Sequence, residues 1–238
     1  YPNPNFLNCN DKNKFLHKYY VNRRKELNIF IDNDGKPYGG KWSFDSDNRK
    51  KLPKDTSLEK ERVFNNKYIQ EAKQYCQKFN TFGSCEKFYY PITFNEAKEN
   101  LEYFLENKFH NFGDYQDSIV KDETFVYHSN ISSSLNCGIL DLNFVVKKII
   151  DIDVPFNAKE GYLRQIIGWR EFMFSVYKSS HISLRTSNFF NFKNKIPEKI
   201  LEAKSGIVPL DDTIKKLERT AYNHHIERLM ILGNLFLL

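Results

Sequence analysis

The stretch that decides the fold is EGYLRQIIGWREFMFSVY, residues Glu160–Tyr177. Its apolar residues lie nearly all the way round a helix, a pattern typical of burial within a helical bundle. Four polar residues interrupt the apolar surface: Arg164, Gln165, Arg170 and Glu171. Because a buried charge needs a partner or a ligand, the favoured interpretation for this helix taken alone is a structural Arg–Glu pair.

Helical patterns continue on both sides of this segment. Thr93-Phe94-Asn95-Glu96 fits a capping box, in which a hydroxyl and a carboxylate satisfy backbone donors at a helix start. NIFID, at Asn28–Asp32, is a candidate strand, and Asn33-Asp34-Gly35 supplies turn chemistry after it. Helices are expected at about 12–26, 61–78, 93–110, 113–121, 128–138, 141–151, 156–178, 196–203 and 210–236. The expected fold class is therefore mainly α.

Composition indicates a folded protein, and we expect it in the cytoplasm. Hydrophobic residues make up 40% of the 238 residues, and no apolar run is long enough to span a bilayer or resembles a signal peptide. The net charge of +6 is compatible with a phosphate-backbone partner, although many proteins without one share it. The four cysteines lie far apart, unlike a zinc site or a disulfide scaffold. The chain begins at Tyr1 and stops inside an apolar run, so we expect a fragment.

AYNHHIERLM, residues Ala221–Met230, carries the next chemical signal. Helical spacing puts five residues along one face of the expected 210–236 helix: Leu217, Ala221, His225, Arg228 and Leu232. A histidine and an arginine one turn apart could hold an anionic or redox cofactor and supply a proton. The alternatives are a metal pair or a surface histidine pair. Since metal pairs prefer i,i+4 spacing, zinc is disfavoured and no metal site is expected.

YHSNISSSLN, residues Tyr127–Asn136, clusters hydroxyl groups at an expected helix start. Such residues ordinarily cap the helix, and capping is the favoured interpretation of this segment in isolation. The same free N–H groups, with hydroxyls nearby, also bind phosphate.

Together these segments resemble the photolyase/cryptochrome superfamily, in the same order along the chain. Trp169–Phe172 matches its WREF core, and His128–Ser132 stands where that family has its TS-x-LS phosphate-binding turn. Ser205–Asp212, followed by Ala221–His225, looks like its TG-x-P-x-VDA…GW-x-H-[NH] stretch.

The resemblance is closer to the bacterial photolyase-related branch, many of whose members carry an iron–sulfur cluster. The features of this branch appear here as Gly39–Asp45 with Asn48-Arg49, Phe112–Asp117, Gly161–Glu171 and His224–Met230. The likeness runs over nearly all 238 residues.

The resemblance implies a U-shaped FAD gripped in a helical bundle. Carried over position by position, the residues facing its pyrophosphate and ribitol would be Tyr115, His128, Ser129, Asn130, Ile131 and Ser132. Those lining the flavin and the lesion pocket would be Gln165, Trp169 and Arg170, with Arg228 beside the isoalloxazine. An aromatic platform such as Trp169 suits a flipped-out dimer.

His225 takes the position where such enzymes place an Asn for cyclobutane dimers or a His for (6-4) photoproducts. A buried imidazole can serve as the acid that (6-4) repair needs. The resemblance therefore implies catalytic roles for His225 and its neighbour His224, and contact of the lesion with Gln165, Trp169 and His225.

The resemblance also implies a domain order. Residues 1–35 would be the C-terminal tail of an α/β antenna domain, 36–92 an interdomain linker with a helix, and 93–238 the N-terminal half of the helical FAD-binding domain. The pocket for an antenna chromophore would lie largely upstream of Tyr1. Pro209 stands where the cluster-bearing branch has a cysteine. Because proline cannot ligate iron, we do not expect an iron–sulfur cluster.

The expected function is light-driven repair of UV-damaged DNA by a monomer, preferably of (6-4) photoproducts because of His224-His225. The alternative is a cryptochrome-type photoreceptor with the same flavin and no repair activity. The combined motifs argue against a helical nucleic-acid-binding protein without a cofactor. We expect this chain alone to be inactive, because the back wall of the flavin site is missing.

Overall fold

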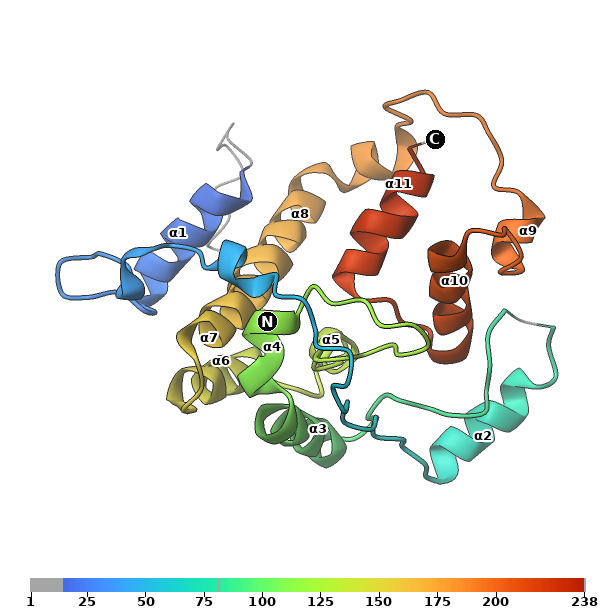
Figure 1. Cartoon of the computed structure of the whole chain (residues 1–238), viewed down its shortest axis with the longest axis horizontal. Helices are drawn as coiled ribbons and strands as arrows, with labels where there is room; N and C mark the ends of the chain where they lie inside the picture. The colour runs from blue at the N-terminus through green and yellow to red at the C-terminus, as the bar shows by residue number, and fades with distance from the viewer. Residues whose placement is uncertain (1–14, 81, 238) are drawn as a thin grey trace. The chain divides into compact units, whose positions relative to one another are not determined.

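The described part of the chain, residues 15–80 and 82–237 of the computed structural model, is predominantly helical (Figure 1). Its only β-pairing consists of two isolated bridges, Ile31 with Pro37 and Val120 with Glu123, and it contains no strand. The predicted mainly α fold class is confirmed. None of the described helices combines the length and apolar character needed to cross a membrane.

The chain divides into two compact units, and each unit is built from two separate stretches. Unit 1 takes its described residues from 15–48 and 142–194, and unit 2 from 49–141 and 195–237. Each unit is described by itself below. The division into an antenna tail, a linker and a catalytic half remains a prediction.

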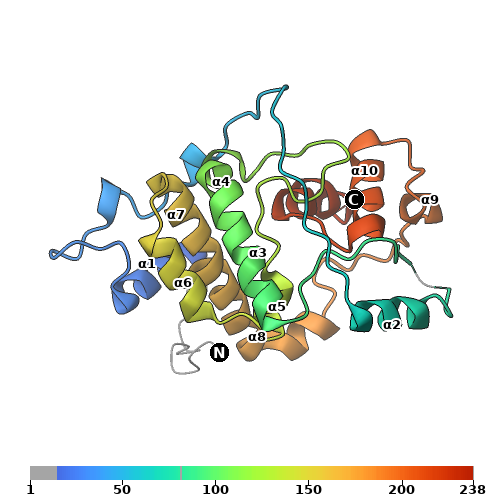
Figure 2. The same cartoon turned by 90° about the horizontal axis from the view of Figure 1, so that it is seen from below.

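Unit 1 is organised around a long helical rod. Its helices are α1 (Leu16–Leu27), the 3₁₀ turns η2 (Tyr38–Gly40) and η3 (Asp45–Asn48), α6 (Leu142–Asp151), α7 (Phe156–Leu163), the π-helix η4 (Arg164–Arg170) and α8 (Glu171–Thr186). The last three follow one another without a break, and α1 packs against η4 (Figures 1 and 2). Gly168 permits this packing, because a Cβ there would lie 3.2 Å from the Tyr20 ring.

A buried carboxylate ties three parts of unit 1 together. Glu160 accepts hydrogen bonds from the Tyr20 hydroxyl at 3.0 Å and from the Phe44 N–H at 2.9 Å. It also pairs with Arg164 Nε at 3.3 Å, and Arg164 reaches Asp45 at 2.9 Å. The structural Arg–Glu pair predicted for this helix is therefore present, and it satisfies charges that would otherwise be buried alone.

Burial along the 160–177 helix stops halfway. Most side chains from Glu160 to Gly168 are buried, whereas Trp169, Met173, Phe174 and Tyr177 are exposed. The prediction of burial along the whole helix was wrong for its second half. Within unit 1, the 12 residues of α1 cover η4 and the start of α8, and the rest of α8 extends beyond them.

The predicted strand at Asn28–Asp32 was also wrong. Arg24 donates hydrogen bonds to the carbonyls of Ile29 at 3.2 Å and Phe30 at 2.5 Å, and Phe30 adopts a φ of 52°. The Phe30 carbonyl also accepts from the Tyr38 N–H at 3.0 Å, and Ile31 forms an isolated bridge with Pro37. A strand does not form because a φ of 52° at Asn28 and Phe30 lies in the left-handed region and not in the extended one. The turn predicted after this segment is present, with Gly35 at a φ of 75°.

Unit 2 contains the remaining helices. They are α2 (Lys67–Cys76), α3 (Phe94–Asn107), α4 (Phe109–Tyr115), α5 (Ser132–Asn136), α9 (Glu198–Leu201), α10 (Val208–Thr220), the π-helix η5 (Glu227–Leu232) and α11 (Gly233–Leu235). The capping box is confirmed, since Thr93 and Glu96 each bind the other's backbone N–H. Phe104, Phe109 and Phe112 pack against one another where α3 meets α4.

Several helices of unit 2 are shorter than predicted. α2 begins at Lys67 rather than near residue 61, because the Asn66 side chain accepts from the first free N–H groups and caps the helix there. The helix expected at 113–121 ends at Tyr115, and the carbonyl of Gln116 bonds to His128 instead.

The most consequential correction concerns the helix expected at 210–236. Ala221 adopts the left-handed region with a φ of 54°, so α10 ends at Thr220. The chain then turns, and Asn223 donates to the carbonyl of Thr213 at 3.0 Å. The single helix face predicted to run from Leu217 to Leu232 therefore does not exist. The sequence gives no local signal of this break, because alanine is a strong helix former.

Candidate functional site

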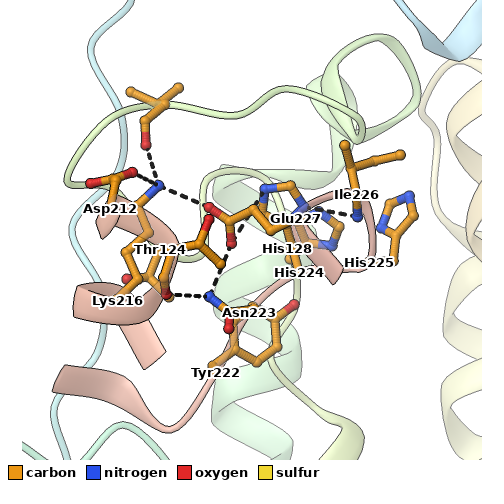
Figure 3. Close-up of polar contacts among 12 residues, drawn as sticks. Thr124, His128, Asp212, Lys216, Tyr222, Asn223, His224, His225, Ile226 and Glu227 are labelled. Atoms are coloured by element: carbon orange, nitrogen blue, oxygen red, sulfur yellow. Dashed lines mark hydrogen bonds and ion pairs between the residues drawn. The ribbon is translucent and has the colours of Figure 1, made fainter. Parts of the chain in front are cut away.

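Three imidazoles from two distant segments of unit 2 meet in one cluster (Figure 3). His224 and His225 lie just before η5, and His128 comes from the loop between α4 and α5. The His128 ring stacks on His224 with centroids 5.0 Å apart, and His225 lies edge-on to His128 at 5.3 Å. The two candidate catalytic histidines therefore contact the first residue of the predicted phosphate-binding turn.

Two of these imidazoles have hydrogen-bond partners that fix their tautomers. His225 Nε2 lies 3.0 Å from Asp117 Oδ1, and His128 Nε2 lies 3.0 Å from the carbonyl oxygen of Gln116. Because both partners only accept, each Nε2 carries a proton and donates it to its partner. Burial and the neighbouring imidazoles hold the pKa of His128 well below its usual value.

His224 is the fully buried member of the cluster. Its Nδ1 accepts from the N–H of Ile226 at 3.3 Å, and its Nε2 lies 3.8 Å from Glu227 Oε2. Burial lowers the pKa of His224 to about 3, helped by the charges of His225 and Lys216. His224 is therefore a neutral imidazole at pH 7.

The nitrogen atoms of the three rings lie within 4.8 Å of one another, a spacing that a metal ion could bridge. A shared ion needs lone pairs that converge on one point. The planes of His128 and His224 are stacked at 15°, so lone pairs that lie in these nearly parallel planes do not converge on one point, and His224 Nδ1 already accepts from Ile226. As arranged, the three imidazoles are in ring contact with one another, and each makes a hydrogen bond to a group outside the cluster.

A buried ammonium group supports this cluster from α10. Lys216 Nζ lies 2.8 Å from Asp212, 2.9 Å from Glu227 and 2.6 Å from the carbonyl oxygen of Val120. Asn223 Nδ2 lies 3.4 Å from the other oxygen of Glu227 (Figure 3). Lys216 on α10 thus holds two other segments in place: the start of η5 and the loop that leads to His128.

The loop before His128 is held under backbone strain. Val126 adopts a φ of 44°, which is an outlier for a β-branched residue. Arg219 donates to the carbonyl of Asp122 at 2.6 Å and to Thr124 at 3.2 Å, and the Asp122 N–H donates to Asp212 at 3.1 Å. Such strain persists where the surrounding contacts over-determine the backbone, and it concentrates at functional sites.

The predicted phosphate-binding turn, His128–Ser132, and the two serines that follow it in α5 contain buried polar atoms that lack partners. Asn130 adopts a φ of 52° and donates to the carbonyl of Tyr89 at 2.9 Å. α5 begins at Ser132 without any side-chain cap, so the capping interpretation was wrong. Three buried side-chain oxygens here have no hydrogen-bond partner: Asn130 Oδ1, Ser133 Oγ and Ser134 Oγ. Buried polar groups of this kind are rare and call for a partner.

The other residues of the predicted turn have ordinary surroundings. Tyr115, the last residue of α4, places its ring 5.6 Å from Tyr127. The carbonyl of Ser129 accepts from Asn100 at 3.3 Å. Ile131 is buried and Ser132 is exposed.

The remaining predicted flavin contacts lie on π-helices. Gln165, Trp169 and Arg170 belong to η4 of unit 1, and Arg228 belongs to η5 of unit 2. Trp169 is 44% exposed, and Arg170 pairs with Glu171 at 3.1 Å. π-Helices are rare and frequent at functional sites, which favours a role for both segments. That the two sets of residues face one cavity remains a prediction.

Sequence reasoning missed the residues that support the histidines. Asp212 and Lys216 are spaced i,i+4, so their ion pair could have been anticipated from the sequence. Asp117 is 108 positions from His225, and no local pattern links them. The same holds for Gln116 and His128, which only the tertiary fold brings together.

Comparisons with known proteins agree with these motifs. A family model described as "Deoxyribodipyrimidine photo-lyase-related protein" matches residues 5–90. A "(6-4) photolyase" of Agrobacterium fabrum (strain C58 / ATCC 33970) is 32% identical over 234 residues, which are 95% of this chain and 46% of that protein. "Uncharacterized protein R853" of Acanthamoeba polyphaga mimivirus is 34% identical over 103 residues, which are 41% of this chain and 78% of that protein.

The fold and the site define a class: a mainly helical protein with a strained polar loop and a histidine cluster at the start of a π-helix. The matches give the family. The chain belongs to the photolyase-related branch of the photolyase/cryptochrome superfamily. It spans about half the length of the Agrobacterium relative.

Proposed function

We propose that this chain belongs to a light-driven DNA photolyase that uses FAD to repair UV-induced pyrimidine dimers, and that its substrate is the (6-4) photoproduct. Membership of the photolyase-related branch and the name of the Agrobacterium relative support this proposal. The observation that carries it is the pairing of His225 with Asp117 beside two neutral imidazoles.

His225 has the properties of a proton donor. Its side chain is 34% exposed, so a bound ligand can reach it, and the Asp117 carboxylate lies 3.0 Å from its Nε2. A carboxylate in this position accepts from Nε2 and orients the ring, so that Nδ1 is left for a bound ligand. His224, whose pKa is lowered to about 3, cannot be the acid near neutral pH. We therefore assign the proton donor to His225 and a positioning role to His224.

The predicted phosphate-binding turn, together with the two serines that follow it, fits a polar cofactor. The buried Ser133 and Ser134 hydroxyls have no acceptor, and Asn130 Oδ1 has no donor, as expected if a phosphate and a polyol chain lie against them. We propose that Tyr115 and His128–Ser132 hold the pyrophosphate and ribitol of FAD. When bound, the reduced flavin supplies the electron for repair after it absorbs light.

The π-helix η4 offers the aromatic surface for the lesion. The 44% exposed ring of Trp169 can stack on a flipped-out base. Gln165 and Arg170 precede and follow Trp169 on the same π-helix. We propose that these three residues, with Arg228, line the flavin and the lesion.

The test is repair under blue light, with the protein that contains this chain and oligonucleotides carrying one (6-4) photoproduct or one cyclobutane dimer. We expect repair of the (6-4) photoproduct. Since a positioned acid contributes about 10²–10⁴-fold, His225→Ala should slow this repair at least about 100-fold and leave the bound flavin spectrum unchanged.

The exposed His110 on α4 provides a matched control, because His110→Ala removes an imidazole from the same unit without touching the cluster. If His225→Ala repaired the (6-4) photoproduct as fast as the wild type, His225 would not be the proton donor. Bound, light-responsive flavin with no repair of either lesion would favour the cryptochrome-type photoreceptor instead.

A further inference from the structure

The end of α8 and the segment that follows it combine positive charge with exposed rings. From Phe172 to Pro197 the sequence contains no Asp or Glu, and its basic residues are Lys178, Arg185, Lys193 and Lys195. Every residue from 182 to 199 is exposed. This segment has no part in the site described above.

Residues 187–194, which we name the aromatic loop, are closed by hydrogen bonds. The Asn191 N–H donates to the carbonyl of Asn188 at 3.0 Å, which makes a turn, and Asn191 adopts a φ of 54°. The Asn188 side chain donates to the carbonyl of Phe192 at 2.6 Å and accepts from its N–H at 3.0 Å. The loop is therefore built around a defined turn.

This turn presents three phenylalanines to solvent. Phe189 is 89% exposed, Phe190 60% and Phe192 46%. Phe190 stacks on Phe192 with centroids 5.2 Å apart, and Phe189 stands edge-on to Phe190 at 5.0 Å. A contiguous apolar patch held on the surface in this way indicates a binding surface.

We propose that the aromatic loop binds unpaired nucleotides of single-stranded DNA. Bases stack on the phenylalanine rings, while Arg185 and Lys193 neutralise phosphates on either side of them. Aromatic rings interleaved with cations are the combination that binds single strands without sequence preference. The absence of acidic residues from 172–197 disfavours a basic protein partner, and its positive charge disfavours a second copy of the same surface.

The inference deepens the proposed function, because it rests on DNA as the partner and names a surface for it. Flipping a lesion out of a duplex leaves neighbouring bases without their stack. A surface that binds unpaired bases would stabilise that open state.

The test is binding of a fluorescently labelled, undamaged oligothymidylate in the dark, followed by anisotropy over a series of salt concentrations. The double variant Phe189→Leu/Phe190→Leu keeps apolar side chains and removes two rings. We expect it to raise Kd about tenfold or more, since stacking on one aromatic side chain accounts for about 1–3 kcal/mol. The affinity for single strands falls with salt, with a slope of log K against log salt concentration of about −0.7 for each phosphate contact. The double variant Arg185→Gln/Lys193→Gln removes two such contacts and should make this slope shallower by about 1.4.

Phe94→Leu is the matched control, because Phe94 is also a phenylalanine, is 64% exposed and lies on α3 of unit 2. It should leave Kd unchanged, and circular dichroism should show that all variants are folded. An unchanged Kd in the ring variant would overturn the proposal, as would equal weakening by Phe94→Leu. Light scattering could also show that the wild type is a dimer and the ring variant a monomer. That result would assign the aromatic loop to self-association and overturn the proposal.

The assay needs no lesion, flavin or light, so its outcome is separable from that of repair. Repair by the protein with an unchanged Kd in the ring variant would remove the DNA-binding role of the aromatic loop and leave the photolyase proposal intact. Binding that depends on the rings, without any repair, would support the DNA-binding role of the aromatic loop and contradict the photolyase proposal.

Discussion

At the scale of the residue, the pKa of His224 has a consequence for stability. Its folded-state pKa of about 3 lies below the ordinary value of 6.5, so between these limits the unfolded chain binds more protons than the folded one. Stability from this group is therefore complete above about pH 6.5 and is lost as the pH falls toward 3. The lowered pKa of His128 acts in the same direction.

We predict that lowering the pH from 7 to 5 removes about 2 kcal/mol of unfolding free energy through His224 alone. Urea denaturation at the two pH values measures this loss. His224→Gln should reduce the difference by about this amount, because glutamine does not titrate. The exposed His110→Gln should leave the difference as it is. Equal pH dependence in wild type and His224→Gln would show that His224 is not buried in its neutral form.

At the scale of the element, the end of α10 decides the position of the histidines. Ala221 sits in the left-handed region with a φ of 54° and separates α10 from η5. A residue with a Cβ loses about 1–2 kcal/mol in this conformation, whereas glycine adopts it freely. Glycine in turn loses more conformational entropy on folding, so the net gain is smaller.

We predict that Ala221→Gly raises the unfolding free energy by about 0.5–1 kcal/mol. Ala72→Gly, at an exposed position inside α2, should lower it by about 1 kcal/mol. The two identical substitutions should thus have opposite signs in chemical denaturation. Destabilisation by both would mean that α10 continues through Ala221, and that the histidines lie on the helix face expected from the sequence pattern.

At the scale of the whole molecule, each unit depends on its own buried charged group. Glu160 joins α1, the Phe44 backbone and α7 within unit 1, and Lys216 joins α10, η5 and the loop before His128 within unit 2. The two tryptophans of the chain, Trp42 and Trp169, both belong to unit 1. Tryptophan fluorescence therefore follows the unfolding of unit 1, whereas far-UV circular dichroism follows both units.

We predict that Glu160→Ala lowers the stability of unit 1 by about 3–5 kcal/mol, because it leaves Arg164 and the Phe44 N–H without their buried partner. The fluorescence midpoint in urea should fall accordingly, and Glu160→Gln, which keeps an acceptor oxygen, should lower it less. Lys216→Met should shift the circular dichroism transition and leave the fluorescence midpoint in place. Equal fluorescence shifts for Glu160→Ala and Lys216→Met would contradict separate cores in the two units.

Local signals explain why some elements were predictable. The capping box at Thr93 and Glu96 satisfies backbone groups within one turn, so it holds in any tertiary context. The rod of α7, η4 and α8 follows from apolar spacing, and its Arg–Glu pairs follow from the need to neutralise buried charge. The strand predicted at Asn28–Asp32 does not form, because Asn28 and Phe30 adopt a left-handed φ of 52° beside the buried Arg24 guanidinium, and this tertiary contact overrides β propensity.

The amino-acid sequence by itself determined the helical class, the family and the segments that carry chemistry, because each depends on residue types at fixed short spacings. Only the tertiary structure decided which of those residues meet. Ala221 breaks the expected helix, the strained loop at Val126 brings His128 to His224, and Asp117 reaches His225 from 108 positions away. Those contacts depend on backbone angles and long-range packing, which no periodicity in the chain encodes.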